Sequence, residues 1–228
     1  MRILVTGGAG YIGSHTLIEL ISTGYSVIVL DNFSNSSPKV IKRVERIVHT
    51  PIPCYNFDLQ NKELLAKLFK KERFDAVIHF AGLKAVGESM ANPLLYYRTN
   101  INSTLSLLEV MEMYNVQTLV FSSSATVYGS ASIPYTEKSP TGQGITNPYG
   151  QSKYMIEQIL RDTAAAHTGN RFTILRYFNP IGAHPSCLIG EHPQGVPNNL
   201  MPYLTQVATG KRDFLSVFGN YSYFFAND

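Results

Sequence analysis

Tyr149 and Lys153, four residues apart, are the residues whose types and spacing most directly suggest chemistry. Asn147 can cap a helix that starts here and Pro148 can take its first position, so both side chains fall on one helix face. A neighbouring ammonium and a helix N-terminus both favour a phenolate. We therefore expect the pKa of Tyr149 to lie below its ordinary value of about 10, as a general base requires. On its own, such a pair is more often a solvated surface pair.

A run of hydroxyl residues precedes this pair, in the stretch 122–129, which reads SSSATVYG. The apolar run before it predicts a strand over 118–122. At the carboxyl end of a parallel strand, Ser124 would face a ligand crevice. Serines that follow a strand are also ordinary turn residues, so this stretch alone leaves both interpretations open.

The elements that must position these residues begin at the N-terminus, where the apolar run 2–6 leads into Gly7, Gly10 and Gly13. A strand, a glycine turn and a helix over 14–23 form a junction that binds phosphate, although this glycine spacing is one residue wider than the usual pattern. Asp31 ends the second apolar run, 26–30, where a carboxylate meets the adenosine ribose of a dinucleotide. The carboxylate also favours NAD over NADP, because it would repel a 2′-phosphate.

Strands continue to alternate with helices along the chain. We expect helices at 39–49, 61–73 and 93–114, and further strands at 55–58 and 75–80. Asp58 either reaches the adenine or caps the helix at 61–73. His79 lies within an apolar strand and is expected to be a satisfied core residue. The long helix should bury an apolar stripe made of Leu94, Tyr97, Ile101, Leu105, Leu108 and Met111. This alternation predicts an α/β, doubly wound parallel sheet, Rossmann-like, with ligands at its carboxyl edge.

Composition limits the classes of partner. The chain has 228 residues, 44% hydrophobic and 15% charged, enough for one full α/β domain with some length left over. A net charge of +3 without any block of like charges indicates neither nucleic acid nor a membrane surface. No apolar run is long enough to span a bilayer, so we expect a cytoplasmic protein. Two distant cysteines and six scattered histidines predict free thiols and no metal site.

Five stretches carry a resemblance to the UDP-glucose 4-epimerase family of the extended short-chain dehydrogenase/reductase superfamily. They are residues 5–16, 79–89, 122–129, 175–180 and 197–203, and the likeness runs from residue 1 to about residue 220. The resemblance implies an isomerase of galactose metabolism that interconverts UDP-glucose and UDP-galactose at C4, with NAD as the cofactor. It also implies a possible homodimer, formed through the helices at about 93–114 and 150–168.

The resemblance also implies residue roles. Tyr149 would be the catalytic base, Ser124 would share the proton of the sugar 4-hydroxyl, and Lys153 would bind the nicotinamide ribose and tune the tyrosine. The implied NAD site comprises Gly7, Gly10, Tyr11, Ile12, Gly13, Asp31, Asn32, Asp58, Leu59, Phe80, Ala81, Gly82, Lys84, Tyr149, Lys153 and Phe178. The implied UDP-sugar site comprises Lys84, Ser124, Tyr149, Asn179, Asn199, Leu200, Ser216 and Phe218.

The end of the chain departs from the family. We expect an NAD-binding domain at 1–178 and the start of a substrate-binding region at 179–228, with a divergent tail from about 221. The family continues for roughly a hundred further residues, the size of a second lobe. This predicts a chain that retains NAD but binds UDP-sugar weakly and turns over slowly or not at all. The alternatives are an NAD-binding protein with little catalysis and a nucleotide-sugar 4,6-dehydratase, which would carry an acid near residues 125–127.

Overall fold

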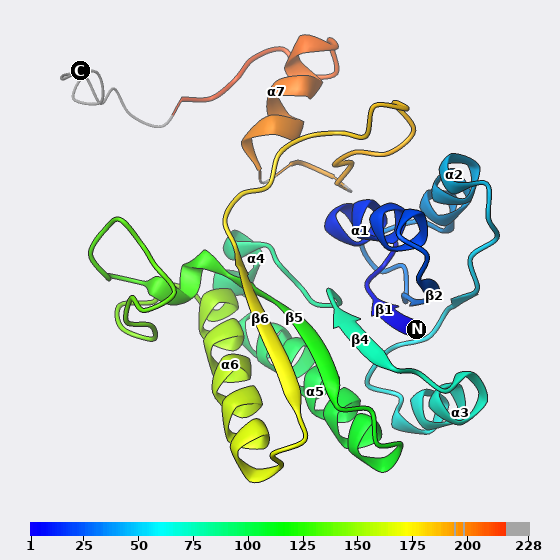
Figure 1. The fold of residues 1–228 in the computed structure, drawn as a ribbon. Helices are drawn as coiled ribbons and strands as arrows, with labels where there is room; N and C mark the ends of the chain where they lie inside the picture. The colour runs from blue at the N-terminus through cyan, green and yellow to red at the C-terminus, as the bar shows by residue number, and fades with distance from the viewer. Residues whose placement is uncertain (194, 198, 218–228) are drawn as a thin grey trace.

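The computed structural model describes residues 1–193, 195–197 and 199–217, and its centre is a six-stranded sheet (Figure 1). The strands are β1 (Arg2–Thr6), β2 (Ser26–Leu30), β3 (Cys54–Tyr55), β4 (Ala76–His79), β5 (Thr118–Ser124) and β6 (Arg171–Tyr177). Their order is β3-β2-β1-β4-β5-β6, and all neighbours pair in parallel. The order reverses between β1 and β4, which is where doubly wound sheets bind ligands. The predicted fold class is confirmed.

Helices cover both faces of this sheet because the strands are apolar on both sides. On one face, α1 (Tyr11–Ser22) and α2 (Pro38–Val48) pack on Ile3, Val5 and the facing residues of β2. On the other, α3 (Lys62–Glu72), α5 (Pro93–Met113) and α6 (Pro148–Ala166) pack around Leu4 and Phe121. These two cores hold the sheet edge, and with it the loops at the carboxyl ends of the strands, in place.

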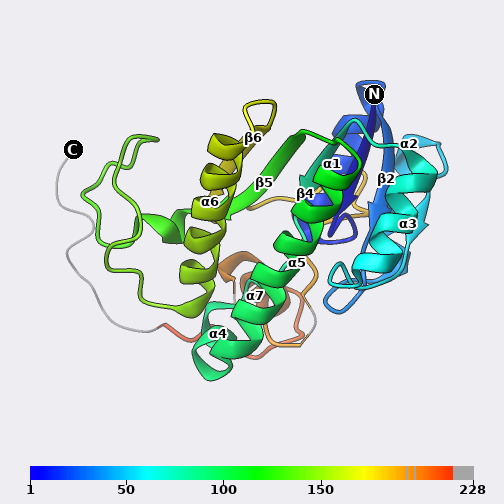
Figure 2. The same ribbon diagram turned by 90° about the horizontal axis from the view of Figure 1, so that it is seen from below.

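Three shorter helices lie at or beyond the carboxyl edge of the sheet: α4 (Val86–Ala91), the 3-10 helix η1 (Ala125–Tyr128) and α7 (Leu200–Ala208). In Figures 1 and 2, α7 lies past the ends of β4 to β6 and outside the sheet layers. β6 ends at Tyr177, close to the expected domain boundary at 178, and that division stays a prediction. In the part of the chain that the structure describes, none of the helices combines the length and the apolar character that a membrane span needs.

The alternative role of Asp58 as a helix cap is wrong. β3 ends at Tyr55, before the expected 58, and α3 is capped by Asn61, whose Oδ1 accepts a hydrogen bond from Leu64 N at 3.1 Å. Asp58 Oδ1 instead accepts from Gln60 N at 2.9 Å, two residues on. Such a local turn is the usual competitor of a cap for a short acidic side chain. Asp58 is thereby kept at the loop after β3.

The stripe expected on α5 is partly wrong. Leu94 and Leu105 are 75% and 39% exposed, whereas the buried face carries the polar residues Asn100 and Thr104. Thr104 Oγ1 lies 3.1 Å from His79 Nε2, and the other ring nitrogen of that histidine lies 2.7 Å from Thr6 Oγ1. These polar groups are hydrogen-bonded to one another, so they can be buried. The face of α5 that packs on the core is therefore not the apolar stripe expected from the sequence. His79 is confirmed as a satisfied core residue, and burial lowers its pKa to about 3.

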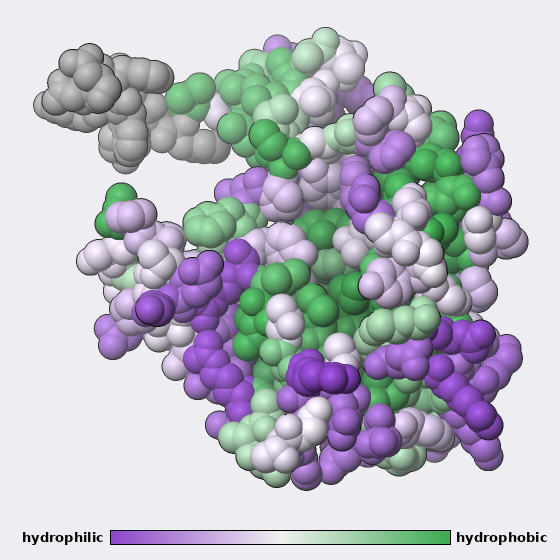
Figure 3. Space-filling model, in the orientation of Figure 1, coloured by the Kyte–Doolittle hydropathy of each residue, from purple (hydrophilic) through white to green (hydrophobic). Residues whose placement is uncertain are grey.

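Apolar side chains gather in the middle of the view in Figure 3, where Figure 1 places β4 to β6. On the edge strand β6, Phe172 and Ile174 pack against the core under α5 and α6. Side chains alternate along a strand, so Leu175 faces the other way, and it is 39% exposed. The two free cysteines, Cys54 and Cys187, are both exposed.

Candidate active site

The glycine turn after β1 presses directly on the end of β4. Gly7 has φ +69°, and a Cβ built there would lie 2.6 Å from Ala81 N. A Cβ at Gly13 would collide with the carbonyl oxygen of Gly7. Helix α1 starts at Tyr11, and no side chain caps its N-terminus. Close-packed backbone in front of an uncapped helix N-terminus fits a pyrophosphate, which supplies the missing hydrogen-bond acceptors.

Asp31, at the end of β2, braces this turn. Its Oδ2 accepts from Ala9 N at 3.0 Å, and its Oδ1 accepts from Phe33 N and Ser36 Oγ, both at 2.9 Å. The residue is only 9% exposed. A carboxylate has about four acceptor positions, so three contacts leave capacity for a ribose hydroxyl. The residue expected to meet the cofactor therefore also fixes the shape of the phosphate turn.

Asn32, Asp58 and Leu59 meet at the neighbouring ends of β2 and β3. Asn32 Nδ2 donates to Asp58 Oδ2 at 3.0 Å, although the two are far apart in sequence. Leu59 is 5% exposed and belongs to the core. The structure thus brings together three residues predicted for the NAD site.

Ser124 and Tyr149 are joined at the end of β5. Ser124 Oγ accepts from Thr126 N at 3.3 Å and from Thr126 Oγ1 at 3.0 Å. With both acceptor positions used, the serine proton is available to the oxygen of Tyr149, its third partner. Thr126, which the sequence analysis did not place in the site, therefore orients the serine.

The expected lowering of the Tyr149 pKa is wrong for this structure. Burial raises the pKa of Tyr149 above 10.0, and the hydrogen bond with Ser124 opposes that rise without cancelling it. The helix itself starts as expected, with Pro148 first and Asn147 Oδ1 accepting from Gly150 N at 2.8 Å. The sequence showed the spacing but not the burial, which comes from packing of the helix on the sheet.

Lys153 contributes less positive charge to the tyrosine than expected. Its Nζ donates to the Ser122 carbonyl oxygen at 2.8 Å and lies 6.0 Å from the centre of the Tyr149 ring. The residue is 5% exposed, and burial lowers its pKa to about 8. Its ammonium is therefore turned toward the strand, and it loses its charge just above neutral pH.

The loop after β4 approaches α6 at Gly82. A Cβ built there would lie 3.1 Å from Asn100 Oδ1 and 3.8 Å from Lys153 Nζ. Asn100 holds the loop through Leu83, accepting from its N at 2.8 Å and donating to its O at 3.1 Å. It also donates to Ser152 Oγ at 3.1 Å. The only sequence signal for Asn100 was a polar residue inside a long apolar helix.

Glu191 connects Lys84, which was predicted for both the NAD and the UDP-sugar site, with Asn199, which was predicted for the UDP-sugar site alone. Its Oε1 accepts from Lys84 Nζ at 3.2 Å and from Asn199 Nδ2 at 2.5 Å. In the same region, Tyr11 Oη donates to the Gly182 carbonyl oxygen at 2.9 Å. Burial, and after it the charge of Glu191, raises the pKa of Tyr11. The segment after β6 thus reaches back over α1, which sequence reasoning did not anticipate.

The other predicted residues are spread more widely. Phe80 packs at the margin of the core under α1 and α2, whereas Phe178 is 64% exposed. Asn179 and Leu200 are exposed. Ser216 follows α7 and makes no hydrogen bond to the rest of the site within the described ranges. Phe218 lies outside the described residues.

Comparison with known proteins agrees with this geometry. A model of the NAD dependent epimerase/dehydratase family matches residues 3–223. The chain belongs to this family. It is 57% identical to the UDP-glucose 4-epimerase of Bacillus subtilis and 54% identical to that of Homo sapiens, and covers 65% of each of them with 96% of its own length.

Solved structures show the same likeness. The UDP-glucose 4-epimerase from Bifidobacterium longum, in complex with NAD+ and UDP, is 53% identical with a TM-score of 0.91, over 93% of this chain and 63% of that one. The enzyme from Stenotrophomonas maltophila, with bound NAD and formylated UDP-arabinopyranose, is 47% identical with a TM-score of 0.92. That match covers 96% of this chain and 65% of the other. The resemblance predicted from the sequence is confirmed. The chain spans about two thirds of the length of these relatives.

Proposed function

We propose that this chain binds NAD at the carboxyl edge of its sheet and that Ser124, Tyr149 and Lys153 serve the interconversion of UDP-glucose and UDP-galactose at C4. The observation that carries the proposal is the meeting of these three residues at the end of β5, beside the loop at Gly82. The proposal places the protein in the cytoplasm and in galactose metabolism. It also includes a homodimer through α5 and α6, which the exposed Leu94 and Leu105 on α5 support.

The chain's own residues fit NAD. The turn at Gly7 leaves no space for a side chain, and helix α1 has no cap of its own, so a pyrophosphate is the matching partner. Asp31 keeps an acceptor position for a ribose hydroxyl. The relatives from Bifidobacterium longum and Stenotrophomonas maltophila were solved with NAD, which supports the same ligand here.

The protein's part in the reaction is the handling of one proton. When bound, NAD+ supplies a hydride acceptor and a positive charge. Tyr149, as the phenolate, takes the proton of the sugar 4-hydroxyl, and Ser124 favours that phenolate by donating a hydrogen bond to its oxygen. Thr126 keeps the serine proton turned that way, and Lys153 holds its place by donating to the Ser122 carbonyl. The cycle is complete when the hydride is back at C4 of the sugar and Tyr149 has returned the proton to the 4-oxygen.

The residues after Ser124 favour an epimerase over a 4,6-dehydratase. A dehydratase needs a further acid and base beside the sugar to remove water. Residues 125–127 form the start of η1 and are alanine, threonine and valine. None of these three can act as an acid or base at neutral pH.

The test measures binding and conversion separately. Isothermal titration should show NAD binding, and a coupled assay should detect UDP-glucose formed from UDP-galactose. Tyr149→Phe should keep NAD affinity within about twofold and reduce conversion by about 10²- to 10⁴-fold, the size of a lost general base. A full-length relative with the same substitution is the control for the assay. Absence of NAD binding, or unchanged conversion by the variant, contradicts the proposal, and binding without any conversion favours a non-catalytic NAD-binding protein.

A further inference from the structure

The side of α6 that faces the sheet carries three functional groups at intervals of one turn: Tyr149, Lys153 and Glu157. The first two meet the strand residues 122–124, as described above. Glu157 meets the same run, because Ser123 Oγ donates to its Oε1 at 2.6 Å. Each of three successive serines therefore contacts one of three successive turns of the helix.

Glu157 is the most heavily bonded of these groups. Its side chain has 0% exposure, and Arg176 of β6 donates to both carboxylate oxygens, Nε to Oε1 at 3.0 Å and Nη2 to Oε2 at 2.8 Å. Arg161, on the next turn of α6, donates to Oε2 at 3.2 Å and is half exposed. A two-pronged contact of this kind fixes direction as well as distance. The hydrogen bond with Glu157 is also the main reason that the pKa of Arg176 is raised.

The contacts of Glu157 tie α6 to two strands at one level. Ser123 and Arg176 are register partners on β5 and β6. One carboxylate thus holds the helix to adjacent residues of two strands. A helix advances about 1.5 Å per residue, so a slide of one residue would break both strand contacts. The same slide would move Tyr149 and Lys153 along β5.

We propose that Glu157 is a positioning residue of the active site: through Ser123 and Arg176 it sets the height of α6 on the sheet, and thereby places Tyr149 at Ser124 and Lys153 at the Ser122 carbonyl. That these residues form an active site rests on the proposed function. The placement of α6 by Glu157 does not depend on NAD binding.

The test compares three variants of this chain. Glu157→Gln keeps the shape but removes the charge, and Ser123→Ala removes only the contact to β5. Arg161→Ala is the matched control, because it removes a partner of Glu157 that lies on the helix itself and ties nothing to the sheet. The readouts are the titration of Lys153, followed by NMR with lysine labelled at Cε and assigned with Lys153→Met, and the NAD dissociation constant.

In Glu157→Gln, a looser helix admits water to Lys153, so its titration midpoint should move upward from about 8 toward the ordinary 10.5. NAD affinity should fall by about tenfold, the loss typical when a group that orients a binding residue is removed. Ser123→Ala should show both effects in smaller size. Arg161→Ala should match the unsubstituted chain in both.

A residue with a purely structural role would give another result. In that case, folded Glu157→Gln at 25 °C would show the same Lys153 titration and the same NAD affinity as the unsubstituted chain, even if its melting temperature fell. That result rejects the proposal. Should Glu157→Gln not fold, the same two readouts in Ser123→Ala decide. If the unsubstituted chain does not bind NAD, the proposed function fails, while the Lys153 titration still decides the role of Glu157.

Discussion

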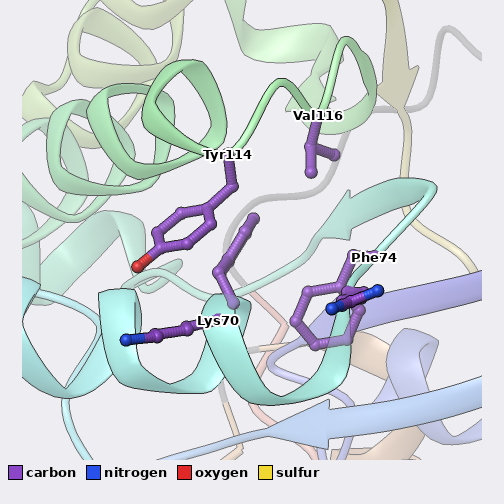
Figure 4. Close-up of a pocket in the computed structure, with 6 residues that line it drawn as sticks. Lys70, Phe74, Tyr114 and Val116 are labelled. Carbon is purple, nitrogen blue, oxygen red and sulfur yellow. The ribbon is translucent and has the colours of Figure 1, made fainter.

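The two edges of the sheet differ in what the chain places there. At the carboxyl edge, glycine turns, the buried Asp31 and the Ser124–Tyr149 pair converge. At the amino edge there are two surface pockets. One lies between α3 and α5, where Lys70, Phe74, Tyr114 and Val116 surround it (Figure 4). The second lies between α5 and α6.

These two pockets thus lie away from the residues that could do chemistry. Phe74 and Val116 lie two residues before β4 and β5, so the first pocket is closed by the segments that lead into strands carrying the site at their other ends. Its walls are rings and long side chains from helix ends. Neither of these two pockets therefore identifies a function. The convergence of buried polar groups with close-packed backbone at the carboxyl edge does indicate a function. Paired substitutions at the two edges can test this difference.

The largest difference in stability is expected between two glycine substitutions, one at the carboxyl edge and one in a surface turn. Gly7→Ala at the carboxyl edge should lower the free energy of unfolding by about 4 kcal/mol, because a positive φ and a collision with Ala81 add together. Gly24→Ala, in the turn before β2, has φ +89° but nothing within 4 Å of its Cβ, and should cost about 1 kcal/mol. Urea denaturation measures both. Equal losses would mean that the turn at Gly7 is no more tightly packed than a surface turn.

Much of the carboxyl edge follows from local sequence. The turn with Gly7, the acid at the end of β2 and the cap at Asn147 each depend on a few adjacent residues, and their places were predicted. The expected end of β5 at residue 122 was too early. Serines are weak strand formers, and the last three residues of β5 are held by pairing with residues 175–177 of β6.

Long-range partners were beyond the reach of the sequence. Glu157 needs Arg176 from another strand, and Glu191 needs Lys84 from the loop after β4. Nothing in the sequence next to either acid indicates these contacts. The predicted direction of the Tyr149 pKa shift was wrong for a related reason. Helical spacing shows which side chains are neighbours, but it does not show how much water surrounds them.

A second, smaller difference is expected in how stability depends on pH when a lysine is replaced at one edge or the other. The pKa of Lys153 is about 8 in the folded chain and 10.5 ordinarily, so between these values the unfolded chain binds more protons. Stability should therefore rise with pH across this window, by about 2 kcal/mol from pH 7.5 to 9.5. Lys153→Met should lack this rise, whereas Lys70→Met, beside the amino-edge pocket, should keep it. Urea midpoints at several pH values measure the effect, and a parallel rise in Lys153→Met would show that another group is responsible.

The smallest contrast compares two aspartates that each accept a backbone hydrogen bond. Asp31→Asn replaces an acceptor oxygen with an NH₂ donor, which then faces either Ala9 N or the donors Phe33 N and Ser36 Oγ. One buried donor is left unsatisfied, so the loss of stability should be about 1 to 2 kcal/mol.

NAD affinity should fall with it by about tenfold, because the same oxygens shape the phosphate turn and receive the ribose. Asp75→Asn, at the amino end of β4, disturbs only an exposed contact, in which Asp75 Oδ2 accepts from Arg2 N at 2.6 Å. It should cost about 0.5 kcal/mol and leave NAD affinity unchanged. Titration calorimetry and urea denaturation of both variants measure this. If Asp31→Asn binds NAD as well as the unsubstituted chain, the turn keeps its shape without the carboxylate, and Asp31 braces the fold rather than the cofactor.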